Sequence, residues 1–272
     1  MKKYFVFLMM LFCLCLTSCC DKPNTNIVII PTTRNTTNTI TTTQTETTTQ
    51  ISTQTVTQTT TVPTTSTTTT TIPYYNSFVL ENFNTIFQYP ELPTGCEVTS
   101  LCEVLVYYGF NIDKVTLADN YLPKYYNNEG NTSDAFIGNP HLESGWGCEA
   151  PVIVKTANSY LSSVESNYLA TDLTETEFKD VLQNIAFGNP LIVWTTSGLQ
   201  SPNFQTYWQT QNGKNFTFAQ GEHCVVVYGY DISNNIVYVA DPLAGNTTLP
   251  LDSFESIYNQ MGKQVVIIKK GP

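Results

Sequence analysis

Cys96 is the residue of this sequence best placed for nucleophilic chemistry. It follows an irregular Pro/Gly stretch (92–95) and begins a segment whose apolar residues recur at helical spacing up to Gly109. A thiol at the N-terminus of a helix faces unpaired backbone N–H groups and the positive end of the helix dipole, and both favour the reactive thiolate. The segment alone leaves open the alternative of a buried cysteine that packs the core.

A cysteine nucleophile needs a base within hydrogen-bond reach and a group that orients the base. The chain has two histidines, and His141 lies in an expected loop. His223 begins one β-rich run and Asp241 ends the next, so a hairpin folded about residues 232–233 places residue 241 or 242 opposite His223. A carboxylate there would hold the imidazole in one tautomer. The alternatives are a strand-end histidine without a partner and plain turn chemistry at Asp241.

Gln88 precedes Cys96 by a short loop and is close enough in sequence to reach the same cleft as a donor to a developing oxyanion. Its alternative is an ordinary surface glutamine. No cofactor and no metal are expected, because His141 is isolated and no cluster has ligand spacing.

The elements around these residues predict an α+β fold with an antiparallel sheet, since helices come first and strands later at hairpin spacing. Besides the helix that starts at Cys96, helices are expected near 150–161, 175–187 and 253–260. Thr174 and Glu177 form a capping-box pattern for the helix at 175–187, Gly188 ends it, and Asp252 is the expected cap of the last helix. The expected strands are 191–195, 223–230, 236–240 and 264–269.

The first 73 residues have a different composition from the rest. Residues 1–18 combine two lysines with a short apolar run, which is typical of an export signal. The Leu-Thr-Ser-Cys ending at Cys19 resembles the lipobox of bacterial lipoproteins, which implies cleavage before Cys19 and acylation of its sulfur. The alternatives are an ordinary signal peptide or an uncleaved anchor. Residues 19–73 are rich in threonine and poor in apolar residues, so we expect a disordered tether, followed by one folded domain at 74–272.

The remaining composition limits the partners. A net charge of −10 with a single arginine argues against nucleic acid. Four of the eight cysteines fall in the folded domain, and we expect Cys102, Cys148 and Cys224 to be structural thiols. Trp146, Trp194 and Trp208 are candidates to line a cleft, although core packing is expected for at least two of them.

Nine short motifs in order then point to a known family. The stretch around Cys96 resembles the exported branch of the Peptidase C39 like family, papain-like cysteine peptidases related to bacteriocin-processing double-glycine leader peptidases. The resemblance covers about residues 78 to 268. Its motifs are 88–97, 107–109, 121–124, 138–140, 147–155, 190–194, 222–226, 229–231 and 241–243.

The resemblance implies a papain-like fold with Cys96 as nucleophile, His223 as general base, Asp241 as its orienting group and Gln88 as oxyanion donor. It implies hydrolysis of peptide or similar amide bonds in a peptide or protein substrate. We expect a monomer anchored by lipid to the outer face of the bacterial membrane or the cell surface. Processing of double-glycine leaders is not expected, because those relatives are fused to transporters. Two alternatives stay open: another amide hydrolase or transamidase, for example acting on peptidoglycan, and a non-enzymatic surface binding module.

Overall fold

The computed structural model describes residues 73–126, 130–210 and 213–271 of the 272-residue chain. Residues 75–272 form one compact unit. The predicted signal peptide, the lipidation site at Cys19 and nearly all of the predicted tether lie outside the described residues. Among the described residues, no helix has both the length and the apolar character needed to cross a membrane.

An antiparallel sheet forms the centre of the unit, with the strand order β10-β9-β8-β5-β11-β4 and a short β1 paired with β8. β8 is the longest of the described strands, and it pairs with β1, β5 and β9. The strands are β1 (Ser77–Val79), β4 (Tyr168–Asp172), β5 (Leu191–Thr196), β8 (Glu222–Asp231), β9 (Ile236–Asp241), β10 (Gly245–Pro250) and β11 (Val265–Lys270).

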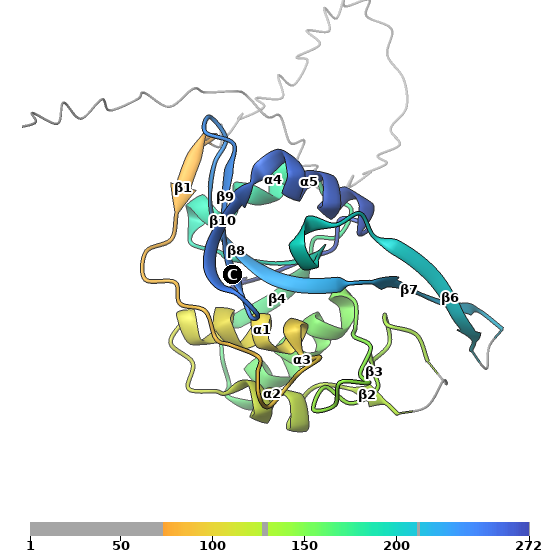
Figure 1. Cartoon of the computed structure of the whole chain (residues 1–272). Helices are drawn as coiled ribbons and strands as arrows, with labels where there is room; N and C mark the ends of the chain where they lie inside the picture. The colour runs from red at the N-terminus through yellow and green to blue at the C-terminus, as the bar shows by residue number, and fades with distance from the viewer. Residues whose placement is uncertain (1–72, 127–129, 211–212, 272) are drawn as a thin grey trace, which may run out of the picture. The chain divides into compact units, whose positions relative to one another are not determined.

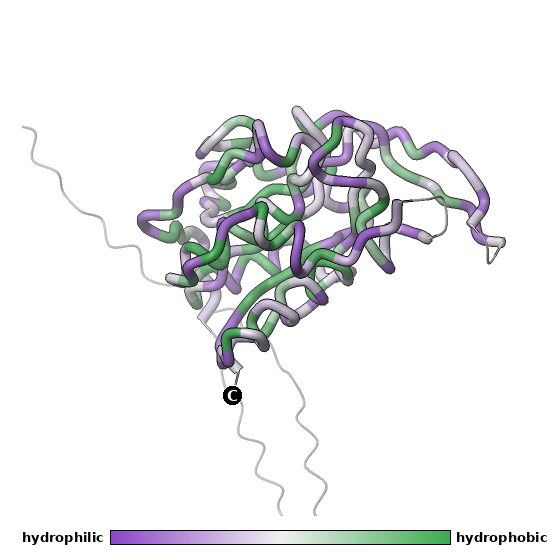
Figure 2. The backbone as a smooth tube through the Cα atoms, turned by 90° about the horizontal axis from the view of Figure 1, so that it is seen from below, coloured by the Kyte–Doolittle hydropathy of each residue, from purple (hydrophilic) through white to green (hydrophobic). Residues whose placement is uncertain are grey.

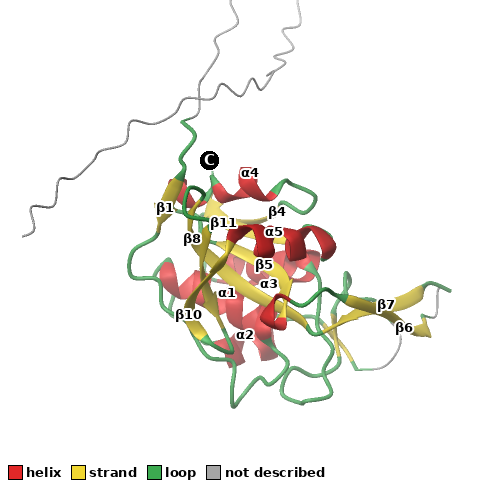
Figure 3. Ribbon diagram, turned by 45° about the horizontal axis from the view of Figure 1, so that its top comes forward, coloured by secondary structure: helices red, strands yellow, loops and turns green. Residues whose placement is uncertain are grey.

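Helices cover both faces of the sheet (Figure 1, Figure 3). On one face lie α1 (Cys96–Tyr107), α2 (Lys114–Asn120) and α3 (Ala150–Ser163), and on the other α4 (Phe178–Leu182) and α5 (Leu251–Gln260). The hydrophobic core therefore has two parts, one on each face of the sheet, because successive residues of a strand point to opposite faces. Cys224 and Val226 of β8 pack with residues of α1, whereas Val225 packs with Phe254 of α5.

Two smaller strand pairs extend the molecule. β6 (Asn203–Gln209) and β7 (Asn215–Gln220) form a hairpin that projects from the body, where the tube is largely hydrophilic or mixed in colour (Figure 1, Figure 2). β2 (Lys124–Tyr125) and β3 (Phe136–Ile137) form a short parallel pair. Two 3-10 turns, Ile185–Phe187 and Ser197–Leu199, complete the regular structure of the described residues.

The α+β prediction with an antiparallel sheet is confirmed, and so is the helix that begins at Cys96. Gly109 adopts a φ of 88° just past this helix, and the N–H of Phe110 bonds back to the carbonyl of Leu105. This is the left-handed C′ position expected for that glycine. The helix predicted at 150–161 and the strands predicted at 191–195, 223–230, 236–240 and 264–269 are also present.

The helix predicted at 175–187 is instead broken into α4 and the 3-10 turn at Ile185–Phe187, although Gly188 ends it as expected with a φ of 85°. The capping box is wrong: the hydroxyl of Thr174 is buried without a partner, and its N–H bonds to Asp172. Glu177 pairs with Lys263, so a tertiary contact takes the second capping side chain away. The cap of α5 is Pro250, and Asp252 lies in its first turn.

Candidate active site

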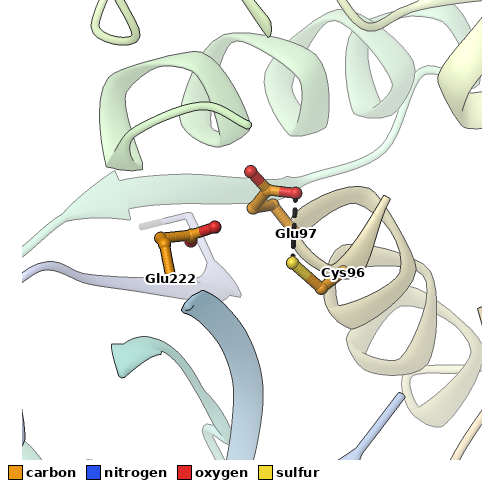
Figure 4. A group of neighbouring side chains, drawn as sticks. All are labelled: Cys96, Glu97 and Glu222. Carbon is orange, nitrogen blue, oxygen red and sulfur yellow. Dashed lines mark hydrogen bonds between the residues drawn. The ribbon is translucent and has the colours of Figure 1, made fainter. Parts of the chain in front are cut away.

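Cys96 is the first residue of α1 and is only 7% exposed. Its Sγ donates a hydrogen bond to Oε2 of Glu97 at 3.4 Å (Figure 4). Burial, followed by the negative charges of Glu97 and Glu222, raises the pKa of this thiol well above its ordinary value. The thiolate expected from the helix N-terminus is therefore disfavoured in this arrangement, and that expectation is corrected.

Magnitudes explain the reversal. A helix terminus contributes about 0.3–1 kcal/mol, up to about 2 kcal/mol in partly buried sites. Removing a charged group from water costs several kcal/mol, and nearby like charges add to that cost. On β8, Glu222 shares the face of Cys224 and points toward α1, so a carboxylate lies opposite the thiol.

His223 and Asp241 are in direct contact. Nε2 of His223 lies 2.7 Å from Oδ1 of Asp241, and the imidazole is almost fully buried. Burial raises the pKa of Asp241, but the hydrogen bond and the charge of His223 outweigh it and leave that pKa below its ordinary value. With Nε2 held by the carboxylate, Nδ1 is the ring nitrogen left for proton transfer.

The hairpin reaches this contact by a different register from the predicted one. β8 and β9 pair Asp231 with Ile236 and, beyond a bulge, Val226 with Ala240. Residues of β8 are therefore paired with residues of β9 that lie about two positions later in the chain than a fold about residues 232–233 would give. The difference is already present at the turn, where Asp231 pairs with Ile236, and the bulge moves the pairing back by one residue. Asp241 thus reaches His223 diagonally, through the end of the ladder.

His223 and Asp241 also line a cavity of about 270 Å³ on the α5 side of β8. Val225 and Phe254 contribute its apolar wall. No hydrogen bond joins Sγ of Cys96 to His223 among the described residues, since the thiol turns to Glu97. His223 nevertheless lies within electrostatic reach of the thiol's partner, because its charge lowers the pKa of Glu97 against the larger opposing effect of burial.

Gln88 is buried and lies beside the turn that carries Asp241. Its backbone N–H donates to the carbonyl of Pro242 at 3.0 Å, and its Nε2 donates to the carbonyl of Pro93 at 2.7 Å. Because an amide nitrogen carries two hydrogens, one donor of Gln88 remains after the bond to Pro93. Burial of the side chain excludes the alternative of an ordinary surface glutamine.

Lys114 was missed by the sequence reading, and it holds the loop that carries Gln88. Its ammonium donates to the carbonyls of Phe87 and Gln88, the latter at 2.9 Å, and pairs with Glu91 at 2.7 Å. Lys114 as a whole is 9% exposed and lies at the start of α2. A lysine at the first helical position reads as a surface charge, so only the tertiary structure reveals this contact.

His141 is fully engaged elsewhere. Its Nε2 lies 2.7 Å from Oδ1 of Asp119, and its Nδ1 lies 3.0 Å from the carbonyl of Glu91. It is thus a loop residue, as predicted, and its two ring nitrogens hold the loop to α2 and to the Gln88 loop.

The tryptophans divide between the core and the hairpin. Trp194 is buried in the core, where its indole N–H donates to the carbonyl of Cys148. Trp146 makes edge contacts with Trp208 at 5.3 Å and with Phe216 at 5.6 Å beneath the β6–β7 hairpin. Cys102, Cys148 and Cys224 are buried and free, as expected of structural thiols.

Glu97 and Glu222 are the other residues that the sequence reading missed. One ligand atom from each lies within 4.8 Å of the other and of Sγ of Cys96. Each glutamate adjoins a proposed catalytic residue in the sequence, Glu97 after Cys96 and Glu222 before His223. That adjacency was the available signal, but only α1 packing against β8 brings the two carboxyls together.

This fold, a nucleophile-type helix packed on an antiparallel sheet that carries a His–Asp pair, is that of the papain-like cysteine peptidases. A crystal structure from Bacillus anthracis assigned to the C39-like peptidases is similar, with 34% sequence identity, a TM-score of 0.64 and coverage of 71% of this chain and 98% of that one. The uncharacterized protein YvpB of Bacillus subtilis (strain 168) is 36% identical over 186 residues, 66% of this chain and 71% of that protein.

The sequence pattern of the family described as "Peptidase_C39 like family" matches residues 69–266 of this chain. The chain belongs to this family. The resemblance read from the sequence motifs is therefore confirmed.

Proposed function

We propose that this protein is a cysteine peptidase that hydrolyses peptide bonds through Cys96, His223 and Asp241, with Gln88 as oxyanion donor. The observation that carries the proposal is the 2.7 Å contact between His223 and Asp241, which orients the imidazole and leaves its Nδ1 for a thiol. Membership of the family supports the same chemistry.

The chemistry is acyl transfer. The thiol proton passes to His223 as sulfur attacks the carbonyl carbon, and the negative oxygen accepts a hydrogen bond from the second N–H of Gln88. His223 then gives its proton to the leaving amine, and sulfur remains bound to the acyl group. A water molecule deprotonated by His223 hydrolyses this thioester and restores the thiol.

Catalysis along this route requires the Cys96 side chain to leave Glu97. Rotation about Cα–Cβ carries Sγ between staggered positions without any movement of α1. The arrangement with Sγ on Glu97 is then a resting state in which the nucleophile is protonated. Substrate binding or a change at Glu97 would shift the population toward the thiol–imidazole pair.

We further propose that the domain acts outside the cell, attached through lipid on Cys19 and the Thr-rich segment. The support is the lipobox-like sequence before Cys19 and the composition of residues 19–73. Mass spectrometry of protein from a membrane fraction tests this placement. A mature N-terminus at Cys19 that carries acyl chains supports it, and a free N-terminus elsewhere contradicts it.

The peptidase proposal is tested by intact mass after limiting iodoacetamide, with a parallel screen of peptide libraries. The wild-type protein is compared with Cys96→Ala and His223→Ala, and Cys102→Ala is the matched control because its thiol is buried and lies outside the site. We expect labelling at Cys96 that His223→Ala slows, and cleavage that both variants of the proposed pair abolish and the control retains.

An inert Cys96 without cleavage of any peptide would overturn the proposal and favour the surface binding module. Turnover of amides other than peptides, with the same dependence on Cys96 and His223, would instead favour the other amide hydrolases. The alkylation result and the substrate screen separate these outcomes.

A further inference from the structure

Cys96, Glu97 and Glu222 form a largely buried group, and its two glutamates have no part in the acyl-transfer steps above. The three side chains converge from the start of α1 and the start of β8, with Sγ and the two carboxyls directed toward one another (Figure 4). One ligand atom of each lies within 4.8 Å of the others. Cys96 is 7% exposed and Glu97 is 0% exposed, whereas Glu222 is half-buried with its Oε1 enclosed, so most of the group is shielded from water.

The group is short of positive charge. Neither Glu97 nor Glu222 takes part in an ion pair within the part of the chain that the structure describes. Oε1 of Glu222 is buried and has no hydrogen-bond partner. Buried carboxyl oxygens are normally paired or bound to a metal, because an unpartnered one loses its hydration without compensation.

The surrounding backbone holds the carboxyls in place. The N–H of Cys148 donates to Oε1 of Glu97 at 2.6 Å, which leaves Oε2 directed at the thiol. Gly147 closes over both carboxyls, since a β-carbon there would lie 2.7 Å from Oε1 of Glu97 and 3.3 Å from Oε2 of Glu222. Outer contacts that orient the ligating groups in this way are a regular feature of metal sites.

We propose that Cys96, Glu97 and Glu222 form a binding site for a zinc ion. Zinc takes thiolate sulfur at about 2.3 Å and carboxylate oxygen at about 2.0–2.2 Å in tetrahedral geometry, which implies a sulfur–oxygen separation of about 3.6 Å. The observed separation between Sγ of Cys96 and Oε2 of Glu97 is 3.4 Å. Binding replaces the thiol proton, which is released to solvent, and leaves the fourth position for water.

The donor set selects the kind of metal. Calcium and magnesium take oxygen ligands, and the buried sulfur of Cys96 offers them nothing. A thiolate with two carboxylates suits zinc and its spectroscopic substitute cobalt, which share ligands and geometry. The site is thus distinct in chemistry from an acidic surface cluster.

Zinc at this site would hold the nucleophile. The sulfur electron pair that attacks a carbonyl is the pair that zinc binds, so the zinc-bound protein would be an inactive form of the peptidase. This consequence rests on the proposed function, whereas the binding itself rests only on the three ligand atoms.

Cobalt and zinc titrations of the purified full-length protein test the proposal. We expect one equivalent of Co²⁺ to give a sulfur-to-cobalt charge-transfer band in the near ultraviolet, which Zn²⁺ then removes by displacement. Cys96→Ser should abolish the band, and Glu222→Gln should weaken binding by at least about tenfold, since even outer contacts of a metal site are worth roughly 10–100-fold. The matched controls are Cys102→Ser, a buried thiol elsewhere in α1, and Glu149→Gln, a neighbouring carboxyl outside the group. Both should bind like the wild type, and circular dichroism shows that each variant is folded.

Each result decides the matter. No band, or a band that survives in folded Cys96→Ser, overturns the zinc site. Binding that Glu149→Gln weakens as much as Glu222→Gln also overturns it, because a diffuse acidic surface is then responsible. If the band follows the expected pattern but no peptide is cleaved, the proposed function fails and the site stands. If peptides are cleaved and micromolar zinc neither binds nor inhibits, the site fails and the function stands.

Discussion

Sγ of Cys96 donates its hydrogen bond to Oε2 of Glu97, the next residue in the chain, and not to the imidazole of His223. The nucleophile of the proposed peptidase is therefore held as a neutral thiol by a carboxylate one residue away. The arrangement opposes the helix N-terminus on which Cys96 sits, and it makes Glu97 a determinant of thiol reactivity.

Glu97→Gln should speed the alkylation of Cys96 at neutral pH. The amide oxygen can still accept from the N–H of Cys148, and the amide nitrogen then donates to sulfur where the carboxylate accepted from it. Loss of the negative charge and gain of a donor both lower the pKa of the thiol. We expect the rate with iodoacetamide at pH 7 to rise by about tenfold, the factor for one unit of pKa.

The matched control is Glu103→Gln, which removes another buried carboxyl from the same helix at a position away from the thiol. It should leave the labelling rate of Cys96 unchanged. An equal increase in both variants would mean that loosened packing, and not the contact with Glu97, governs the reactivity.

Asp241→Asn should impair turnover much more than substrate binding. The asparagine can keep a hydrogen bond to His223, but it favours the wrong tautomer and cannot stabilise the imidazolium. A loss in kcat of about 10²–10⁴-fold with a small change in KM is expected, as measured on any substrate that the screen identifies. An increase in KM of similar size with an unchanged kcat would place Asp241 in substrate binding instead.

The same substitution should change the pH dependence of stability. The pKa of Asp241 is lower in the folded protein than its ordinary value, so its contribution to stability is present above that ordinary value, about 3.9, and is lost as the pH falls through the folded pKa. Asp241→Asn should therefore reduce the free energy of unfolding near pH 7 by about 1 kcal/mol and change it little near pH 2. Denaturant unfolding at the two pH values checks the difference.

The sequence predicted the chemistry-bearing residues better than their surroundings. Cys96 at the start of a helix and His223 and Asp241 at the ends of adjacent strands follow from local patterns, because apolar periodicity and turn residues are local signals. The proximity of Glu97 to Glu222 could not be predicted, since it depends on which face of β8 packs against α1. The predicted strand register was also wrong, because the turn pairs Asp231 with Ile236 and so lies about one residue later than a fold about residues 232–233.

Glu103→Gln should stabilise the protein at neutral pH. Glu103 is 1% exposed; Oε1 accepts from the N–H of Ile86 at 2.8 Å, while Oε2 is buried without a partner. Burial, with a smaller effect from the charge of Asp241, raises the pKa of Glu103 well above its ordinary value.

The sign follows from proton linkage. A group whose pKa is raised on folding favours the folded state below its unfolded pKa, and that contribution is lost as the pH rises through the folded value. Glutamine keeps the acceptor for Ile86 and carries no charge at any pH. The variant should match the wild type near pH 4 and exceed it by about 1 kcal/mol or more near pH 8 in urea unfolding. A variant that is less stable at pH 8 would show that the carboxylate has a cationic partner.

Lys114→Met should destabilise the loop that carries Gln88. The ammonium donates to the carbonyls of Phe87 and Gln88, and methionine of similar length has no such donor, so the Gln88 carbonyl keeps only the bond from the N–H of Leu92. Loss of hydrogen bonds to a charged donor costs about 1.5–3 kcal/mol, so a loss of that order in the free energy of unfolding is expected. Displacement of Gln88 should also lower kcat while KM changes less, because the oxyanion forms only in the transition state.

Glu91→Gln separates these carbonyl bonds from the ion pair. It removes the charge that pairs with Lys114 at 2.7 Å but leaves the bonds to the loop carbonyls in place. The Glu91 side chain is 49% exposed, and an exposed ion pair contributes little to stability. Glu91→Gln should therefore unfold at nearly the same denaturant concentration as the wild type and retain its kcat. If Glu91→Gln proves as damaging as Lys114→Met, the ion pair, and not the bonds to the backbone, holds the loop that positions Gln88.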